Sequence, residues 1–266
     1  MSSRRLLLIL SGAAIAFVGA VCGIGGGLFA VPLLHYGFKL PLRRAVATSL
    51  CLVAANAVAS TTAELLHEDG AFLWEVVVPL IGGALVGAQF GFIASRRLPE
   101  RALKGLFAAV MLAAGLRLAL SGDIPAEPAD FHQGYDLARA GMVALVGILA
   151  GTVSPLLGIG GGLVVVPGLL LLIPEIGGLG ARAASLGVAC VTSLRSLQLY
   201  ARERSVELGV APWFVAGALL GASLGVQVVH LDGVAAAGRR LLAVIMVVTA
   251  WRFVRDARRG PVSSAP

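Results

Sequence analysis

The sequence predicts an all-α integral membrane protein with two inverted structural repeats, each made of four helical segments. Three observations carry this prediction. The chain of 266 residues is 58% hydrophobic and 13% charged, whereas a soluble domain has about 25% charged residues. Apolar stretches long enough to span a bilayer recur along the whole length. A glycine-rich motif followed by a proline occurs twice, 135 positions apart.

The repeated motif divides the chain into two halves. The hexapeptide GIGGGL at 23–28 returns at 158–163, each time with a proline five positions after its last glycine. The hexapeptide AVATSL at 45–50 matches ARAASL at 181–186. We therefore assign residues 1–120 to a first membrane repeat, 121–140 to a polar, proline-bearing exposed linker, and 141–266 to a second membrane repeat with a short basic cytoplasmic tail.

Each half contains four apolar segments. The first of each half, at 6–38 and 141–173, has 33 residues, too many for one span, and is interrupted by the glycines. The part after the interruption has about 11 residues, or roughly 16 Å of helix, half a bilayer. We therefore predict a helix, a break near mid-membrane and a short return helix. The other segments are expected to be full spans, at 45–63, 71–94, 103–120, 183–200, 210–229 and 238–254.

The distribution of Lys and Arg supports this hairpin topology. If all eight segments crossed the membrane once, the basic residues would be divided almost equally between the two sides. With two hairpins, fifteen lie on one side, and only Arg139, Arg182, Arg239 and Arg240 lie on the other. Since the cytoplasmic loops of membrane proteins are enriched in Lys and Arg, this distribution predicts that both termini are cytoplasmic. Each half then crosses three times, so the second half is inverted. Two full spans at each hairpin would give the same sidedness, and that alternative stays open.

The net charge of +7 does not indicate nucleic-acid binding, because basic residues of membrane proteins mostly set topology. The first 23 residues have a basic start and an apolar core, as signal peptides do. A similar segment recurs at 142–157, where no signal peptide can lie, so we interpret the first segment as part of the mature protein.

The interrupted segments predict an anion site made of backbone. A helix that is interrupted inside the membrane leaves backbone N–H groups without partners at the interruption. The return helix begins there, so the positive end of its dipole lies at the same place. Two breaks related by a pseudo-twofold axis would meet near the midplane, as in many transporters. The predicted binding residues are the glycines that allow close approach of a ligand: Gly23, Gly25, Gly26 and Gly27 in the first half, and Gly158, Gly160, Gly161 and Gly162 in the second.

Polar side chains of the following segment are expected to complete this site. Ser49 and Asn56 share a helical face, and Ser185 and Thr192 are their counterparts, 136 positions on. Thr48 adds another hydroxyl. The alternative is that small polar residues hold membrane helices together. Arg195 is an intramembrane cation and so a candidate for substrate binding, although its side chain could instead reach the basic loop at 202–204.

Other chemistries are excluded by what the sequence lacks. The glycine motif is not followed by GK[ST], so it is not a phosphate-binding loop. The four histidines fall near loops and do not cluster, and the three cysteines lack metal-binding spacing. We therefore expect no enzyme activity, no metal and no cofactor. No carboxylate lies in the middle of a segment, which favours an anion over a cation as substrate.

The doubled GIGGG-x4-P motif, with AVATSL and RAASL after it, resembles the sulfite exporter TauE/SafE family of bacterial and archaeal membrane permeases. The resemblance covers both halves; the second copy has Ala184 where the first has Thr48. It implies transport of small anions, notably sulfite and organosulfonates, across the bacterial cytoplasmic membrane, with a substrate that differs between members.

We therefore expect a secondary transporter of a small oxyanion or sulfonate that works by alternating access. Its partners would be the anion and the lipid bilayer, with protons as a candidate coupling ion and a homo-oligomer as an open option. The main alternative is a passive anion channel of the same architecture. A membrane enzyme and a non-transporting assembly partner are the remaining rivals.

Overall fold

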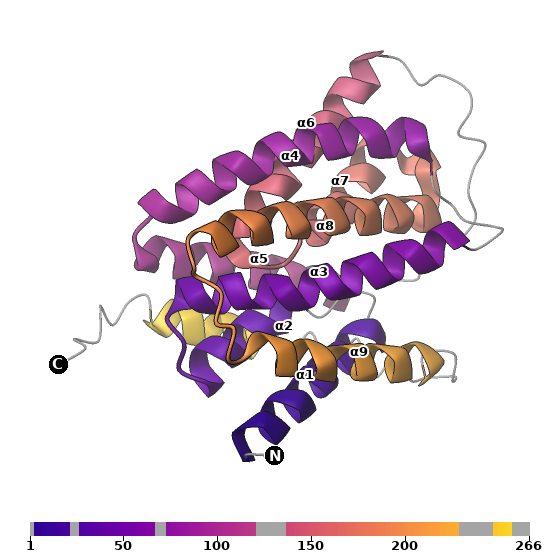
Figure 1. The fold of residues 1–266 in the computed structure, drawn as a ribbon. Helices are drawn as coiled ribbons and strands as arrows, with labels where there is room; N and C mark the ends of the chain where they lie inside the picture. The colour runs from indigo at the N-terminus through magenta and orange to yellow at the C-terminus, as the bar shows by residue number, and fades with distance from the viewer. Residues whose placement is uncertain (1–2, 22–26, 67–72, 121–136, 229–246, 257–266) are drawn as a thin grey trace.

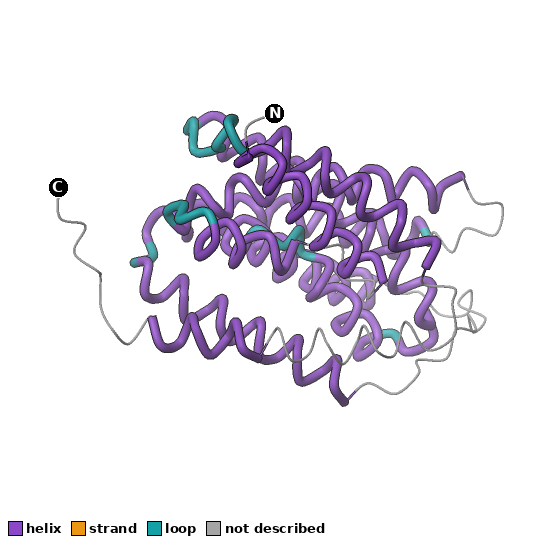
Figure 2. Tube along the Cα trace, turned by 90° about the horizontal axis from the view of Figure 1, so that it is seen from below, coloured by secondary structure: helices purple, strands orange, loops and turns teal. Residues whose placement is uncertain are grey.

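The computed structural model describes residues 3–21, 27–66, 73–120, 137–228 and 247–256, and every regular element in these ranges is a helix. The helices lie side by side in one bundle (Figures 1 and 2). Three are long and apolar enough to cross a membrane, at Leu42–Thr62, Trp74–Arg97 and Leu137–Leu157. Shorter apolar helices cover Arg5–Phe17, Gly27–Gly37, Gly162–Leu172 and Ala211–Gly221.

The helices follow the order expected from the sequence, with shifted ends. In the first half they are α1 (Ser3–Val21), α2 (Gly27–Pro32) with a π-helical turn at Leu33–Gly37, α3 (Leu42–Leu66), α4 (Trp74–Arg97) and α5 (Glu100–Leu120). In the second half they are α6 (Leu137–Leu157), α7 (Gly162–Leu172) with a 3-10 turn at Pro174–Ile176, α8 (Gly177–Arg202), α9 (Ala211–Val228) and a last helix at 247–256.

Several of these helices begin earlier than predicted, and α6 and α8 show the largest differences. α6 begins at Leu137 rather than residue 141, and α8 at Gly177 rather than residue 183. Both predictions were tied to runs of apolar residues, whereas a helix continues through polar residues once its backbone hydrogen bonds are formed. Most of the predicted linker, at 121–136, lies outside the described residues.

Three helix pairs form the bundle, and each pair joins the two halves. α4 packs along α6, α1 along α9, and α3 against α8. Figure 1 shows α4 and α6 on one side of the α3 and α8 pair, and α1 and α9 on the other. The halves are therefore interleaved rather than placed next to each other as separate domains.

Glycines allow the outer pairs to pack closely. A Cβ atom on Gly83 of α4 would collide with the carbonyl oxygen of Ala144 in α6. In the other pair, a Cβ atom on Gly217 of α9 would collide with the carbonyl oxygen of Ile9 in α1. Small residues at four-residue spacing permit such backbone contact in membranes. The two interfaces use positions that correspond in the repeat: Gly87 against Ile148 matches Gly221 against Ala13, and Gly147 against Leu80 matches Gly12 against Phe214.

The chain turns back after α6, so α6 and α7 form a hairpin. A Cβ atom on Gly161, just before α7, would meet the carbonyl oxygen of Ala150 at 2.8 Å. Further along α7, one on Gly168 would meet Val146 at 2.7 Å. Moving forward along α7 therefore means moving backward along α6. α7 has 11 residues, or roughly 16 Å of helix, about half the thickness of a bilayer.

The basic residues gather at one end of the bundle, which we call the basic end. It comprises the start of α3, the end of α4 and the end of α8 with the loop that follows. Arg43 of α3 donates to the carbonyl oxygens of Arg96 and Leu98 at 3.0 and 3.3 Å. Two ion pairs link the same segments, Arg44 with Glu207 at 3.2 Å and Arg96 with Glu203 at 3.1 Å.

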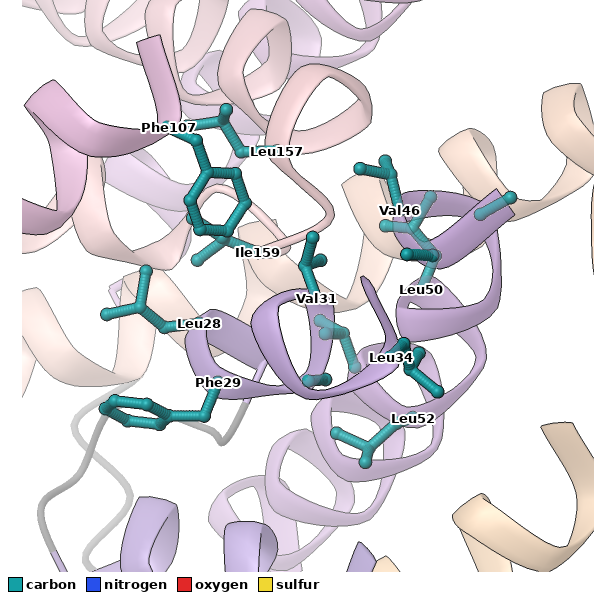
Figure 3. Close-up of a cluster of buried hydrophobic side chains, with 14 of the residues drawn as sticks. Leu28, Phe29, Val31, Leu34, Val46, Leu50, Leu52, Phe107, Leu157 and Ile159 are labelled. Atoms are coloured by element: carbon teal, nitrogen blue, oxygen red, sulfur yellow. The ribbon is translucent and has the colours of Figure 1, made fainter. Parts of the chain in front are cut away.

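The largest apolar core lies where the first half meets the break of the second. Leu28 and Val31 of α2 approach Ile159, and Phe107 of α5 packs over the same region (Figure 3). All four side chains are buried. A second core lies between α4, α6 and α7 around Val76, Leu80, Val146, Val165 and Leu169. Both cores lie beside the short segment that separates α6 from α7, and their packing holds this segment in place.

Candidate anion site at the helix break

The break between α6 and α7 has a backbone that glycine allows. Gly160 and Gly161 have φ of +82° and +77°, in the left-handed region that other residues rarely adopt. Gly158 has φ of +69° and its amide nitrogen still donates to the carbonyl oxygen of Ser154, at 2.8 Å. The chain thus leaves α6, turns sharply and enters α7 within four residues. The residues from Gly158 to Gly161 are buried.

Four carbonyl oxygens of the break, those of its glycines, accept hydrogen bonds from the protein. Ser49 of α3 donates to the carbonyl oxygen of Gly158 at 3.1 Å. Thr192 of α8 donates to that of Gly160 at 2.8 Å, and Ser185 of α8 to that of Gly162 at 3.1 Å. The carbonyl oxygen of Gly161 accepts from the amide of Val164 at 3.0 Å. The negative ends of these peptide groups are therefore paired.

The amide N–H groups of the same segment have no acceptor among the described residues. Within the part of the chain that the structure describes, the N–H groups of residues 159–163 have no hydrogen-bond acceptor. An unpaired N–H group in an apolar environment costs several kcal/mol. These five donors lie at the beginning of α7, where the helix dipole is positive. The break therefore offers donors and positive potential to a ligand that has acceptors and negative charge.

The start of α2, in the first half, also lies at this place. Gly27, the first residue of α2, lies against the second break: a Cβ atom on Gly27 would be 3.3 Å from the carbonyl oxygen of Gly158. Val53 of α3 separates the two, with one methyl group facing Gly27 and the other facing Gly160. The other predicted glycines of the first half, Gly23, Gly25 and Gly26, lie outside the described residues.

The meeting point lies far from both ends of the central helices. Val53 is eleven residues from the start of α3, and Thr192 is ten residues from the end of α8. At 1.5 Å per residue, both are roughly 15 Å from the basic end, half of a 30 Å hydrocarbon layer.

Three of the predicted side chains meet at the break. Ser49, Ser185 and Thr192 were expected to bind the anion with their hydroxyl groups. A hydroxyl group has one proton, and here each donates it to a backbone carbonyl oxygen. In this conformation these residues position the break. Asn56, the fourth member of the predicted set, is buried on the same helix as Ser49.

Two predicted residues lie elsewhere. Thr48 is buried, but it faces the basic end, where its hydroxyl oxygen accepts a hydrogen bond from the amide of Glu207 at 3.1 Å. Arg195 lies on the flank of α8 that faces α4. Its guanidinium donates to Gln198 at 2.8 Å and to Gln89 at 3.2 Å. Successive side chains of an α-helix point in directions about 100° apart. Thr48 and Ser49 therefore face different parts of the molecule although they are adjacent in the sequence.

Sequence reasoning did not find Val53 or Ala150, which contact the break glycines. Both are small apolar residues within apolar helices and carry no chemical signal. Ala189, the counterpart of Val53, also lies at the site, 3.7 Å from a Cβ atom on Gly160. The only indication in the sequence is the repeat itself, because its offset of 136 residues relates Val53 to Ala189.

Comparison with known proteins agrees with this architecture. The model of the family "Sulfite exporter TauE/SafE" matches residues 1–118 and 143–266. The chain belongs to the TauE/SafE family. TauE/SafE proteins are membrane transporters and not enzymes. Among the described residues of this TauE/SafE protein, no three His, Cys, Asp or Glu side chains come together in a way that would hold a metal ion.

Curated relatives of this TauE/SafE protein are named as transporters. It is 33% identical to a "Probable membrane transporter protein" of Xylella fastidiosa over 236 residues, 85% of each chain. It is 29% identical over 202 residues to a protein of the same description from Methanocaldococcus jannaschii, covering 73% of this chain and 71% of the relative. No solved structure matches.

Proposed function

We propose that this TauE/SafE protein is a secondary transporter that moves a small oxyanion or sulfonate across the bacterial cytoplasmic membrane. One observation carries the proposal: the carbonyl oxygens of Gly158, Gly160, Gly161 and Gly162 accept hydrogen bonds from protein groups, whereas the five consecutive N–H groups of residues 159–163 have no acceptor among the residues described. A cation would need the opposite arrangement, with free oxygens. An oxyanion or sulfonate has several acceptor oxygens and a negative charge, and it satisfies both the donors and the helix dipole.

In this proposal the ligand binds to backbone groups around Gly160, Gly161 and Gly162, and to the corresponding Gly25, Gly26 and Gly27. Ser49, Ser185 and Thr192 keep the carbonyl oxygens turned away from the anion. Arg195 contributes positive potential from one helical turn beyond Thr192, without touching the break. Gly27 already lies against Gly158, which supports a single site shared by the two halves.

The transport cycle we propose is alternating access between two inverted repeats. Support comes from the corresponding glycine contacts of the α1 and α9 pair and the α4 and α6 pair, because equivalent packing is what two related halves would produce. We assign the basic end to the cytoplasm from the accumulation of Arg at that end. Both termini are then cytoplasmic. The two halves would rock against each other around the shared break and expose it to each side in turn.

Uptake into proteoliposomes that contain only this protein tests the proposal. The panel is sulfite, sulfate, thiosulfate, sulfoacetate, taurine and small carboxylates, each with and without a proton gradient. We expect saturable uptake and counterflow of at least one sulfur oxyanion or sulfonate. Dependence on the gradient would identify protons as the coupling ion. Uptake without saturation or counterflow would contradict alternating access and indicate a channel.

A pair of variants ties this uptake to the break. We expect Gly161→Leu to abolish uptake, because a side chain there needs an unfavourable φ and collides with Ala150. Gly82→Leu on α4 is the matched control, since a Cβ atom on Gly82 would meet nothing within 4 Å. Membrane insertion should be equal for both. Unchanged transport by Gly161→Leu would exclude the break as the binding site.

A further inference from the structure

A row of buried hydroxyl groups leads from the break along α8. Thr192, Ser196 and Tyr200 are spaced by four residues, so they lie on one face of the helix. Ser196 is 0% exposed and Tyr200 is 3% exposed. The row begins at the site already described, because Thr192 donates to the carbonyl oxygen of Gly160.

Two other helices close over this row. The Ser196 hydroxyl lies 3.4 Å from the hydroxyl of Ser154 on α6. The Tyr200 hydroxyl lies 2.8 Å from the carbonyl oxygen of Pro155 on α6 and 3.0 Å from the hydroxyl of Ser95 on α4. The last carbonyl oxygens of a helix lack hydrogen-bond partners within that helix. The Tyr200 hydroxyl supplies such a partner for the carbonyl oxygen of Pro155 near the end of α6. Neutral hydrogen bonds of this kind are weak individually and can be exchanged.

The row ends at the basic end of the bundle. Eight residues separate Thr192 from Tyr200, or roughly 12 Å of helix. Glu203 follows Tyr200 by three residues and pairs with Arg96 at 3.1 Å. Arg43 lies against the end of α4, where it donates to the carbonyl oxygens of Arg96 and Leu98. The three arginine-bearing segments around the end of the row create a positive potential that attracts anions.

The corresponding residues of the first half are in a different environment. Asn56 and Ser60 are the counterparts of Thr192 and Ser196, 136 positions earlier. Ser60 is exposed, whereas Ser196 is fully buried. If the hydroxyl groups only held helices together, the repeat would bury both serines. The difference fits a molecule in which one half of a route is closed and its counterpart is not.

We propose that the row of Thr192, Ser196 and Tyr200 is the route by which the anion passes between the break and the basic end. The hydrogen bonds of Ser196 and Tyr200 to α6 and α4 close this route in the conformation described. When α8 separates from the other two helices, the freed hydroxyl groups become donors to the passing oxyanion. This proposal rests on the proposed function, because it takes the break as the binding site.

Thiol labelling in the full-length protein tests the route independently of transport. In a background with the three native cysteines replaced by alanine, Ser154→Cys places a thiol on the row, opposite Ser196. Ser193→Cys is the matched control. It is equally buried and lies on α8, but among the residues described its hydroxyl bonds only to its own helix, at the carbonyl oxygen of Cys190. Each reporter is examined with Tyr200 and with Tyr200→Phe, which keeps the ring and removes the hydrogen bonds.

The probe is a membrane-impermeant thiosulfonate reagent, added to one side at a time in vesicles of either orientation. We expect Tyr200→Phe to speed the labelling of Ser154→Cys from the side of the basic end by about fivefold, the shift that loss of one hydrogen bond produces. The labelling of Ser193→Cys should not change. Size-exclusion profiles in detergent establish that each variant is folded.

Two outcomes would overturn the proposal. If Ser154→Cys stays unreactive from both sides in both backgrounds, the row is interior packing and not a route. If Ser193→Cys is accelerated equally, Tyr200→Phe has loosened the whole bundle. Selective acceleration of Ser154→Cys supports the route whatever the uptake assay gives. With selective labelling and no uptake of any anion in the panel, the proposed function fails and the route stands.

Discussion

At the scale of single residues, the hydroxyl of Thr192 decides how the break is held. Its one proton lies within reach of the carbonyl oxygen of Gly160 at 2.8 Å and of Val188 in its own helix at 2.7 Å. Threonine inside a helix normally bonds only to its own preceding turn. The hydrogen bond to the carbonyl oxygen of Gly160 joins α8 to the break and keeps this oxygen away from the N–H donors.

We expect Thr192→Val to reduce uptake strongly while costing only about 1 kcal/mol of stability, the usual net value of one hydrogen bond. Valine has nearly the same shape, so packing is retained while the carbonyl oxygen of Gly160 loses a donor. Thr192→Ser keeps the hydroxyl group and should restore most of the uptake. Uptake rates and thermal unfolding of the purified variants measure the two effects. Equal transport by the valine variant and the wild type would contradict a positioning role for Thr192.

A second residue-level prediction concerns Ser49, which links the two halves. Its hydroxyl donates to the carbonyl oxygen of Val46 at 2.8 Å and reaches that of Gly158 at 3.1 Å. Ser49→Ala removes a side-chain hydrogen bond from α3 to the second break. We expect slower uptake with unchanged membrane insertion. Ser193→Ala, at a buried serine of α8 whose hydroxyl donates to the carbonyl oxygen of Cys190 in its own helix, is the control for loss of a hydroxyl group in the interior. The idea fails if the two variants transport alike.

At the scale of helices, close backbone contact keeps α4 and α6 together. Gly83, Gly87 and Gly91 of α4 face the carbonyl oxygens of Ala144, Ile148 and Thr152 in turn. Because the residue numbers increase together in these successive contacts, α4 and α6 run in the same direction. Two neighbouring helices with parallel dipoles gain nothing electrostatically, so packing is the interaction that stabilises this pair.

We expect Gly87→Leu to disrupt this pair and to reduce the amount of folded protein severely. A leucine side chain there would meet the backbone of α6, which cannot move aside as a flexible side chain could. Gly82→Leu adds the same side chain five residues earlier on α4, where space is open, and should be tolerated. Fluorescence size-exclusion chromatography of the two variants in detergent provides the comparison. Equal yields of monodisperse protein would refute the packing argument.

At the scale of the whole molecule, the helices of one half are completed by those of the other. The glycine face of α1 is covered by α9, and that of α4 is covered by α6. Neither half can therefore bury its close-packing faces alone. We expect residues 1–128 and residues 129–266 to be degraded when expressed separately and to accumulate when expressed together. Immunoblots of membranes measure this, and stable accumulation of either half alone would show that the halves are independent domains.

The topology makes a further prediction at this scale. In the cysteine-free background, Lys39→Cys should be labelled only from the cytoplasm and Glu175→Cys only from the opposite side. Lys39 follows the return helix of the first half, and Glu175 follows the return helix of the second, so the two positions correspond in the repeat. An inverted pair of hairpins places them on opposite faces, whereas repeats of the same orientation would place them on one face. An impermeant maleimide in vesicles of both orientations distinguishes the two.

The sequence by itself determined the class of protein, the division into helices and the place of the break. Hydrophobicity and segment length require a membrane, and glycine adopts the positive φ of Gly160 and Gly161 at no steric cost, so these features follow from local chemistry. The family followed from the same motif. Helix ends were less predictable, because α6 and α8 extend through residues that are not apolar.

Only the tertiary structure decided which groups face one another at the break. The sequence placed Thr48 and Ser49 together, yet one faces the basic end and the other faces Gly158. It also predicts that hydroxyl groups bind the anion, and the structure adds that these hydroxyl groups donate to carbonyl oxygens of the break, while the N–H groups of residues 159–163 have no acceptor among the residues described. Direction of donation depends on the rotation of each helix and on the path of the neighbouring chain, and both are set by packing between segments that are distant in the sequence.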